Sequence, residues 1–481
     1  MIILFLAPVI AFPQDTVDFV SLDKTTYEFY QQGKWEELIH WGKKGLKSGF
    51  DYYYLRARLG VAYFNQGRYF FAAPQFQKSL KFDNQSSFSN EYLYYSLLYS
   101  GQSNEADKLK MKLAPSVQSQ MDNASILKSL YFETGPTFSN AYGDNGKRNL
   151  IGRAGIYGEA NLYGNNYYAH LGLDFRLTGG ITWYLGYSYL IQEKRNDIQY
   201  TTTDLNRVNT IYYDWGYENI YAEQVRYNAV EHKYAIHQNE FYSNLVIPIG
   251  NGWRIIPAFH LIHDSYNPLL LKFSPVESSD TGSYIYADST YNLFNYFEAR
   301  YIQEQRDTSY YNYQAYLGIT KQCNWLNIGL SAAYSNFDGR NQQQYGLAFT
   351  YYPSGKLNYY GTTVFKALIQ EDYAQGFVYQ KFGMKIIEKT WLELFGSYGD
   401  MSKMSEQHAF VIYNLVGKIN YRLGTCLIIS IKKHVELSLR YQFLDRESIR
   451  LQFLSGQRGD IQMNTISYQT HQIFGGIKWK L

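Results

Sequence analysis

VELSLRYQF, residues 435–443, is the stretch that decides the fold of this chain. Its odd-numbered positions are all apolar and its even-numbered positions are all polar. Successive side chains of an extended strand point to opposite faces, so the two sets lie on opposite sides. The pattern predicts a β-strand that is apolar on one side and wet on the other.

The same alternation recurs along most of the chain. Several copies continue for about ten residues, enough for a tilted strand to cross a bilayer, whereas strands of soluble sandwiches usually have about five or six. Short turns alternate with the long polar stretches 193–233 and 264–308, as in outer-membrane barrels. We expect residues 131–481 to form an antiparallel transmembrane β-barrel of about 14 strands, within a range of roughly 12–16. For residues 291–303 the sequence leaves two alternatives, an extra strand or loop structure. The other alternating segments are 169–176, 181–189, 255–261, 326–335, 345–351 and 392–398.

Composition agrees with a barrel in a membrane. The chain has 51 Tyr and 29 Phe, and tyrosine suits surfaces that are apolar on one side and wet on the other. Its 45 basic and 42 acidic residues leave a net charge of +3, which gives no reason to expect nucleic acid as a partner. Five tryptophans lie near predicted strand ends, as an interfacial girdle requires: Trp183, Trp253, Trp325, Trp391 and Trp479.

The first residues indicate export. Residues 1–12 are apolar, with the small Ala11 shortly before a polar segment, which predicts a secretory signal peptide; the alternative is a buried N-terminal strand. No later run of about 18 apolar residues predicts a transmembrane helix. We therefore expect the outer membrane of a Gram-negative bacterium, with lipid around the barrel and the N-terminal domain in the periplasm.

A helical repeat precedes the barrel. Gly33, Gly67 and Gly101 are spaced 34 residues apart, and each follows an aromatic-rich helical stretch. The spacing and pattern resemble the tetratricopeptide repeat (TPR) family over residues 16–115, most closely in the middle copy. Small residues in this pattern let two antiparallel helices approach, and bulky residues fill the space between them. The middle copy carries Leu59, Gly60, Tyr63, Gly67, Tyr69, Ala72, Phe76 and Leu80.

The resemblance implies a protein-binding function for this domain. TPR arrays present a concave surface to protein partners, and about three repeats bury a continuous core. The alternative is a plain helical domain that plugs or supports the barrel. Residues 116–130 are polar and are expected to form a linker. The residues expected to contact a partner are Tyr30, Trp35, Tyr63, Tyr69 and Tyr99.

Polar residues on the strands are candidates for the barrel interior. They could line a selective pore, or they could pair with one another to fill a narrow barrel. No phosphate-binding loop, HExxH motif or nucleophile elbow occurs, so we expect no catalytic residue, cofactor or metal. His260 and His263 are three apart and fall on opposite faces of a strand, which argues against a shared metal. The expected lumen-facing residues are His170, Asp174, Arg176, Glu393, Glu436 and Arg440.

Two functional hypotheses follow from an α+β multidomain chain with an N-terminal helical repeat and a C-terminal barrel. This domain order resembles that of exopolysaccharide-export porins, although their helical arrays are much longer. The first hypothesis is a non-catalytic subunit of an outer-membrane assembly, secretion or transport complex, whose helical domain binds a protein partner. The alternative is an export or diffusion channel for polysaccharide or small solutes, with cargo delivered by the helical domain. A barrel enzyme acting on lipid or glycan is a third hypothesis.

Overall fold

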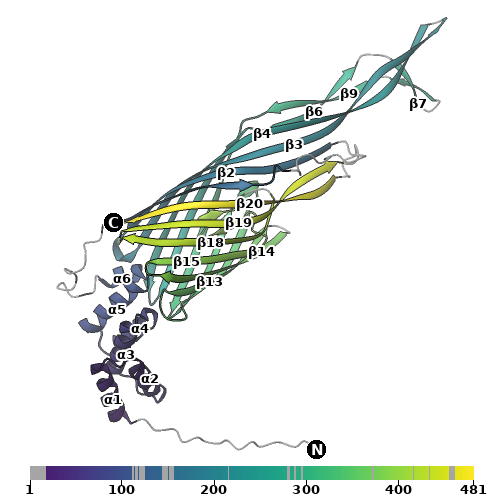
Figure 1. Ribbon diagram of the computed structural model, residues 1–481. Coiled ribbons are helices and arrows are strands. Elements are labelled where there is room, and N and C mark those ends of the chain that lie inside the picture. The colour runs from purple at the N-terminus through teal and green to yellow at the C-terminus, as the bar shows by residue number, and fades with distance from the viewer. Residues whose placement is uncertain are drawn as a thin grey trace, which may run out of the picture.

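The structure is a computed structural model with a helical domain and a β-barrel (Figure 1). The expected signal peptide lies outside the described residues, as does most of the expected linker. The structure describes residues 18–110, 113, 118, 125–143, 150, 157–214, 216–278, 282–286, 289–293, 296–370, 373–414, 417–432, 434–453 and 461–481.

Three helical hairpins form the N-terminal domain. Gly33, Gly67 and Gly101 each lie in the turn within a hairpin, with φ of 67°, 69° and 75°. Glycine adopts this left-handed conformation without the steric cost that a Cβ imposes, which explains the regular spacing. The identification of these hairpins as TPRs stays a prediction. The helices are α1 (Phe19–Gln31), α2 (Trp35–Lys47), α3 (Tyr53–Asn65), α4 (Tyr69–Ser79), α5 (Ser87–Tyr99) and α6 (Ser103–Lys110).

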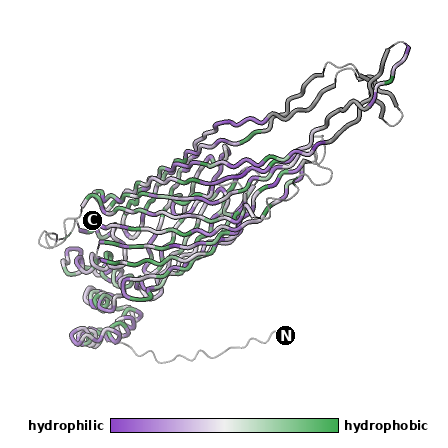
Figure 2. The backbone as a smooth tube through the Cα atoms, turned by 45° about the horizontal axis from the view of Figure 1, so that its top comes forward, coloured by the Kyte–Doolittle hydropathy of each residue, from purple (hydrophilic) through white to green (hydrophobic). Residues whose placement is uncertain are grey.

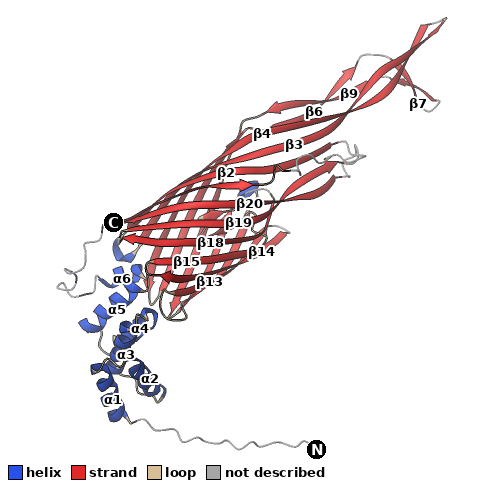
Figure 3. Cartoon of the chain, in the orientation of Figure 1, coloured by secondary structure: helices blue, strands red, loops and turns tan. Residues whose placement is uncertain are grey.

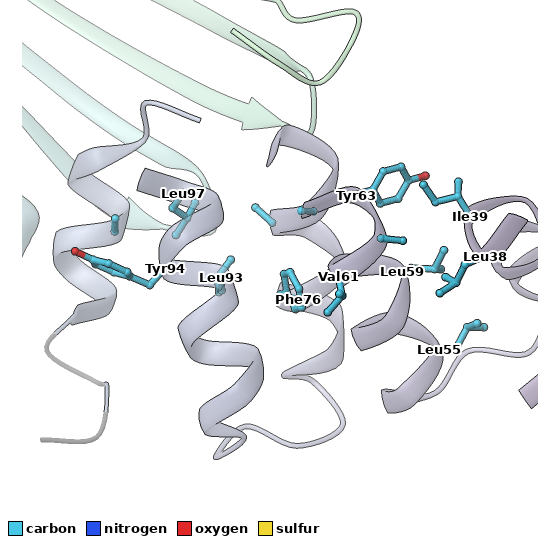
Figure 4. Close-up of a cluster of buried hydrophobic side chains, with 14 of the residues drawn as sticks. Leu38, Ile39, Leu55, Leu59, Val61, Tyr63, Phe76, Leu93, Tyr94 and Leu97 are labelled. Carbon is cyan, nitrogen blue, oxygen red and sulfur yellow. The ribbon is translucent and has the colours of Figure 1, made fainter. Parts of the chain in front are cut away.

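Close helix approach builds the core of this domain (Figure 4). Phe76 is fully buried, and a Cβ at Gly60 would come within 2.6 Å of its ring. Leu59, 1% exposed, lies equally close to the Cβ position of Gly42. The large side chains therefore depend on glycines in the facing helices, as jigsaw packing requires.

The expected antiparallel barrel of about 14 strands is confirmed as a closed barrel of 14 strands. Its first strand, β1, starts at Leu127, four residues before the expected barrel boundary, and pairs with the last strand through Leu130 and Trp479. This pairing leaves no free edge in the wall. In order around the barrel the strands are β1 (Leu127–Ser139), β2 (Tyr157–Arg176), β3 (Thr182–Tyr213), β4 (Gly216–Gly250), β5 (Trp253–Tyr266), β10 (Thr308–Cys323), β11 (Leu326–Ser335), β12 (Gln342–Tyr351), β13 (Tyr359–Gln370), β14 (Tyr373–Ile387), β15 (Thr390–Gly399), β18 (Lys418–Lys432), β19 (Val435–Phe453) and β20 (Ile461–Lys480).

An apolar belt surrounds the barrel. Hydrophobic and hydrophilic positions alternate closely along the wall (Figure 2), and every strand has a large apolar side chain that is at least 40% exposed. Such a surface fits a membrane rather than water. Among the described residues, no helix has the length and apolarity to cross a membrane. In strand order, the belt includes Phe132, Leu171, Tyr187, Phe241, Phe259, Leu317, Leu330, Tyr345, Phe365, Phe382, Leu394, Leu423, Leu439 and Ile477.

Long ribbons extend from the end opposite the helices (Figure 3). The stretch 193–233, expected as a polar loop, continues β3 and β4 as a paired hairpin up to Tyr213 and Gly216. β2 pairs with β3 as far as Tyr200, and beyond that point β3 and β4 continue as a pair. The stretch 264–308 contains β6 (Leu269–Ser278) paired with β9 (Tyr296–Gln305), and β7 (Gly282–Tyr286) paired with β8 (Ser289–Leu293). These pairs lie outside the closed barrel, so residues 291–303 add no strand to the wall.

Candidate functional site

The six residues expected in the lumen lie on the inner face of the wall. His170, 1% exposed, alternates along β2 with the outward Leu171, and its ring nitrogens contact Ser188 (2.9 Å) and Tyr184 (2.6 Å). His260 is buried inside, while the ring of His263 packs on Tyr311 across the outward face of β5 and β10, so these two histidines do lie on opposite faces.

The other five residues each form an ion pair, but none pairs with another member of the set. The sequence did not reveal these partners, because pairing across strands depends on register, which alternation alone leaves open. The pairs are Asp174 with Lys478 (3.2 Å), Arg176 with Asp107 (2.9 Å), Glu393 with Lys381 (2.8 Å), Glu436 with Lys480 (3.0 Å) and Arg440 with Glu133 (3.5 Å).

Residues 400–414, which we call the lumen loop, lie in the connection between β15 and β18 and fold into the barrel. The loop contains the short pair β16 (Ser405–Glu406) and β17 (Val411–Ile412). Its base is fixed by Met401 and Met404, both fully buried against residues of β13, β14, β18 and β19. Strand alternation in the sequence does not predict this loop. The signal for it is the apolar run 409–413 inside a segment that otherwise connects two strands.

A buried ion pair attaches the lumen loop to the wall. Nη2 of Arg422 donates to both carboxylate oxygens of Glu406, at 2.8 and 2.9 Å. Nη2 also donates to Ser397, and the hydroxyl of Tyr413 donates to Glu406 (3.2 Å). The side chains of Glu406 and Arg422 are 8% and 6% exposed, so the two charges depend on each other for solvation.

The tip of the lumen loop crosses to the opposite wall in a strained conformation. Gln407, His408 and Ala409 all have positive φ, of 50°, 60° and 69°. Each non-glycine residue in this region costs roughly 1 kcal/mol or more. Tyr242 donates to the carbonyl oxygen of His408 (3.0 Å), and Nδ1 of His260 donates to that of Ala409 (2.7 Å). These wall contacts offset the strain.

Open space remains beside the loop. A cavity of about 640 Å³ is lined by both wall and loop residues, among them Glu133, Glu240, Lys381, Phe410 and Arg440. A second hollow of about 400 Å³ lies toward the ribbon end, between Lys194, Tyr310 and Asn414. The interior is therefore partly hollow, and residues of the loop share in lining the hollow space.

The helical domain contacts the rim at the opposite end, where the short turns lie. On one side Asp107 pairs with Arg176 and Glu105 with Arg254. Three strands further round from Arg254, the ring of Phe70 stacks on that of Tyr352 (centroids 3.9 Å apart, planes at 15°). The two contact sites place α4–α6 across part of the short-turn opening (Figure 1).

The five residues expected to bind a partner are distributed unevenly over the helical domain. Tyr63 is 4% exposed, so its ring stabilises the core instead of facing a partner. Tyr30 and Trp35 pack edge-on against each other (6.2 Å) and are half-buried. Tyr99 is 47% exposed and lies against Tyr69 (5.1 Å).

Comparisons with known proteins show weak likenesses only. The sequence matches no family model and no curated relative. The toluene transporter TodX of Pseudomonas putida is similar over 76% of this chain and 92% of its own, with 8% identity and a TM-score of 0.39. A Pseudomonas aeruginosa FadL homologue is similar over 74% of this chain and 89% of its own, with 7% identity and a TM-score of 0.39. The translocator domain of the autotransporter NalP from Neisseria meningitidis is similar over 80% of this chain and 99% of its own, with 9% identity and a TM-score of 0.27. These scores carry no argument about function.

Proposed function

We propose that this protein is a non-catalytic outer-membrane channel for small solutes, with the lumen loop as its obstruction. The observation that carries the proposal is the hollow lumen of about 640 Å³, bounded by charged wall residues and by a loop. A purely structural small barrel fills its interior with wall side chains, whereas a wider barrel leaves room for a passage. This arrangement supports the channel hypothesis over the complex-subunit hypothesis.

The orientation follows from the two ends of the barrel. Outer-membrane barrels have short periplasmic turns and long outer loops. The short turns are at the helical end, and the ribbons are at the other. We place the helical domain in the periplasm, where it meets solutes that enter or leave the lumen.

Binding of a protein partner is a second candidate function. Three apolar side chains of α5 are exposed: Phe88 (40%), Leu98 (39%) and Tyr99 (47%). Aromatic residues gathered on one surface are common at protein interfaces. A partner on α5 would be a docking protein for the channel.

Removal of the lumen loop tests the channel proposal. Tyr398 and Tyr421 are direct strand partners, so a short Gly-Ser linker can replace residues 401–416 without moving β15 or β18. We expect the wild type to conduct little in a planar bilayer and the deletion to conduct as an open pore. Deletion of an equal number of residues from the β3–β4 ribbon, outside the wall, should leave the current unchanged. A loop-deleted barrel that inserts but stays sealed would overturn the proposal.

A further inference from the structure

The tip of the lumen loop is bound to the wall as a ligand would be. Phe410 inserts its ring among three wall rings: His170 (4.9 Å), Tyr242 (5.2 Å) and Tyr184 (6.1 Å). All three contacts are close to edge-to-face, with interplanar angles of 69–87°, which is a favoured geometry of aromatic pairs. We call the surroundings of Phe410, formed by these rings and His260, the ring recess.

The ring recess also recognises peptide carbonyls. The hydroxyl of Tyr242 and Nδ1 of His260 donate to two successive carbonyl oxygens of the tip. Nε2 of the same His260 lies 3.4 Å from a carboxylate oxygen of Glu240. The recess therefore packs around an aromatic ring and donates hydrogen bonds to two neighbouring backbone carbonyl oxygens.

The wall has hydrogen-bonding capacity that the tip does not use. Gln314 is the strand partner of His260 and is fully buried. Within the described part of the chain, neither its amide nitrogen nor its amide oxygen has a hydrogen-bond partner. Buried polar groups are usually satisfied. A peptide group, which offers one donor and one acceptor, matches this side-chain amide.

We propose that the ring recess is a binding site for a short peptide with an aromatic side chain, and that the loop tip occupies it as a built-in competitor. The inference rests on the proposed channel function and names its solute class. The peptide 408–410 already fills the recess, so the chemistry that the wall recognises is that of a peptide.

The strain in the tip weakens its binding to the recess, so that a free peptide can compete with it. A tethered ligand has a high effective concentration and would otherwise exclude free solutes. Three consecutive residues with positive φ weaken its hold, because release of the tip relieves their strain. A free peptide needs no such backbone conformation. Its binding would displace the tip from the ring recess. The lumen would then open at the place where the solute binds.

Calorimetry on the full-length protein in detergent tests the inference. The probe is N-acetyl-Ala-Phe-amide, and the control peptide is N-acetyl-Ala-Ala-amide. We expect Phe410→Ala to bind the aromatic probe at least about tenfold more tightly than the wild type, because apparent affinity rises with the fraction of free sites. The control variant Phe365→Ala, which removes an outward ring (45% exposed), should keep the wild-type affinity.

Equal affinity in Phe410→Ala and the wild type, or equal binding of the two peptides, would overturn the inference. If Phe410→Ala does not fold, as judged by heat-modifiable migration, Phe410→Leu replaces it, with a smaller gain expected. Binding in detergent does not depend on conduction. A loop-deleted channel that conducts, with no peptide preference in Phe410→Ala, contradicts only the inference. Peptide binding by a barrel that never conducts contradicts only the channel.

Discussion

The carboxylate of Glu406 and the guanidinium of Arg422 form a buried ion pair that joins the lumen loop to the barrel wall, with contacts of 2.8 and 2.9 Å. One partner belongs to the loop and the other to β18, so the strength of this pair determines how firmly the lumen is obstructed. Loss of one partner leaves the other charge buried without compensation, at a cost of about 3–5 kcal/mol.

Glu406→Gln should loosen the lumen loop. We expect a larger single-channel current than in the wild type and faster protease cleavage within residues 400–414. Lys233→Gln is the control, because Lys233 is 65% exposed and its partner Glu231 is 53% exposed. Exposed pairs contribute at most about 1 kcal/mol, so this variant should behave as the wild type. Identical currents in Glu406→Gln and the control would show that the pair does not hold the loop.

Gly180→Ala should displace α6 from the rim. A Cβ at Gly180 would lie 2.1 Å from the carbonyl oxygen of Asn104, and backbone cannot yield as a flexible side chain does. Gly179 is an internal control: its φ of 75° nearly equals the 76° of Gly180, but a Cβ there meets nothing within 4 Å. Both alanines bear the same conformational cost, and only one clashes. Hydrogen exchange of α6 amides should accelerate in Gly180→Ala alone; equal exchange in both variants would contradict the docking geometry.

Phe70→Ala should weaken the second contact of the helical domain. Its ring is 2% exposed and stacks on Tyr352, so truncation removes both burial and stacking, at a cost of about 3 kcal/mol. A double-mutant cycle with Tyr352→Ala, followed by denaturation of the helical circular dichroism signal, isolates the pair. We expect a coupling of about 1 kcal/mol. Additive effects of the two substitutions would mean that the rings do not interact in solution.

The helical domain should lose stability in acid through Asp51. Arg56, 6% exposed, donates to both Asp51 carboxylate oxygens (2.7 and 2.6 Å) and holds the pKa of that carboxyl below its ordinary value of 3.8. A lowered folded-state pKa stabilises the domain above the unfolded value, and the contribution disappears as pH falls through the folded value. Asp51→Asn should therefore reduce the free energy of unfolding of the helical domain at pH 7 by about 1 kcal/mol, measured as a lower melting temperature. The difference should vanish below the folded pKa; a constant difference across pH would contradict the assignment.

Regular patterns made much of this fold predictable. The alternation in 435–443 recurs in several strands of the wall, and it predicts inward positions for Glu436 and Arg440 without knowledge of their strand partners. The 34-residue glycine spacing predicted a helical repeat, and the structure has a positive-φ glycine in the turn of each of three helical hairpins. Both patterns are local consequences of backbone geometry, a period of two in a strand and a positive φ in a tight turn.

The sequence by itself determined the class of each part of the chain: helical hairpins first, then a closed wall of about 14 strands with an apolar outside and a polar inside. Only the tertiary structure decided what fills and covers that wall. The lumen loop meets His260 and Tyr242 across the barrel, and Phe70 meets Tyr352 at the rim. These contacts join residues more than 140 positions apart, in each case. They depend on strand register and barrel closure, two properties that local periodicity does not encode. The obstruction of the lumen, and with it the proposed function, is therefore a property of the closed barrel and not of any single segment.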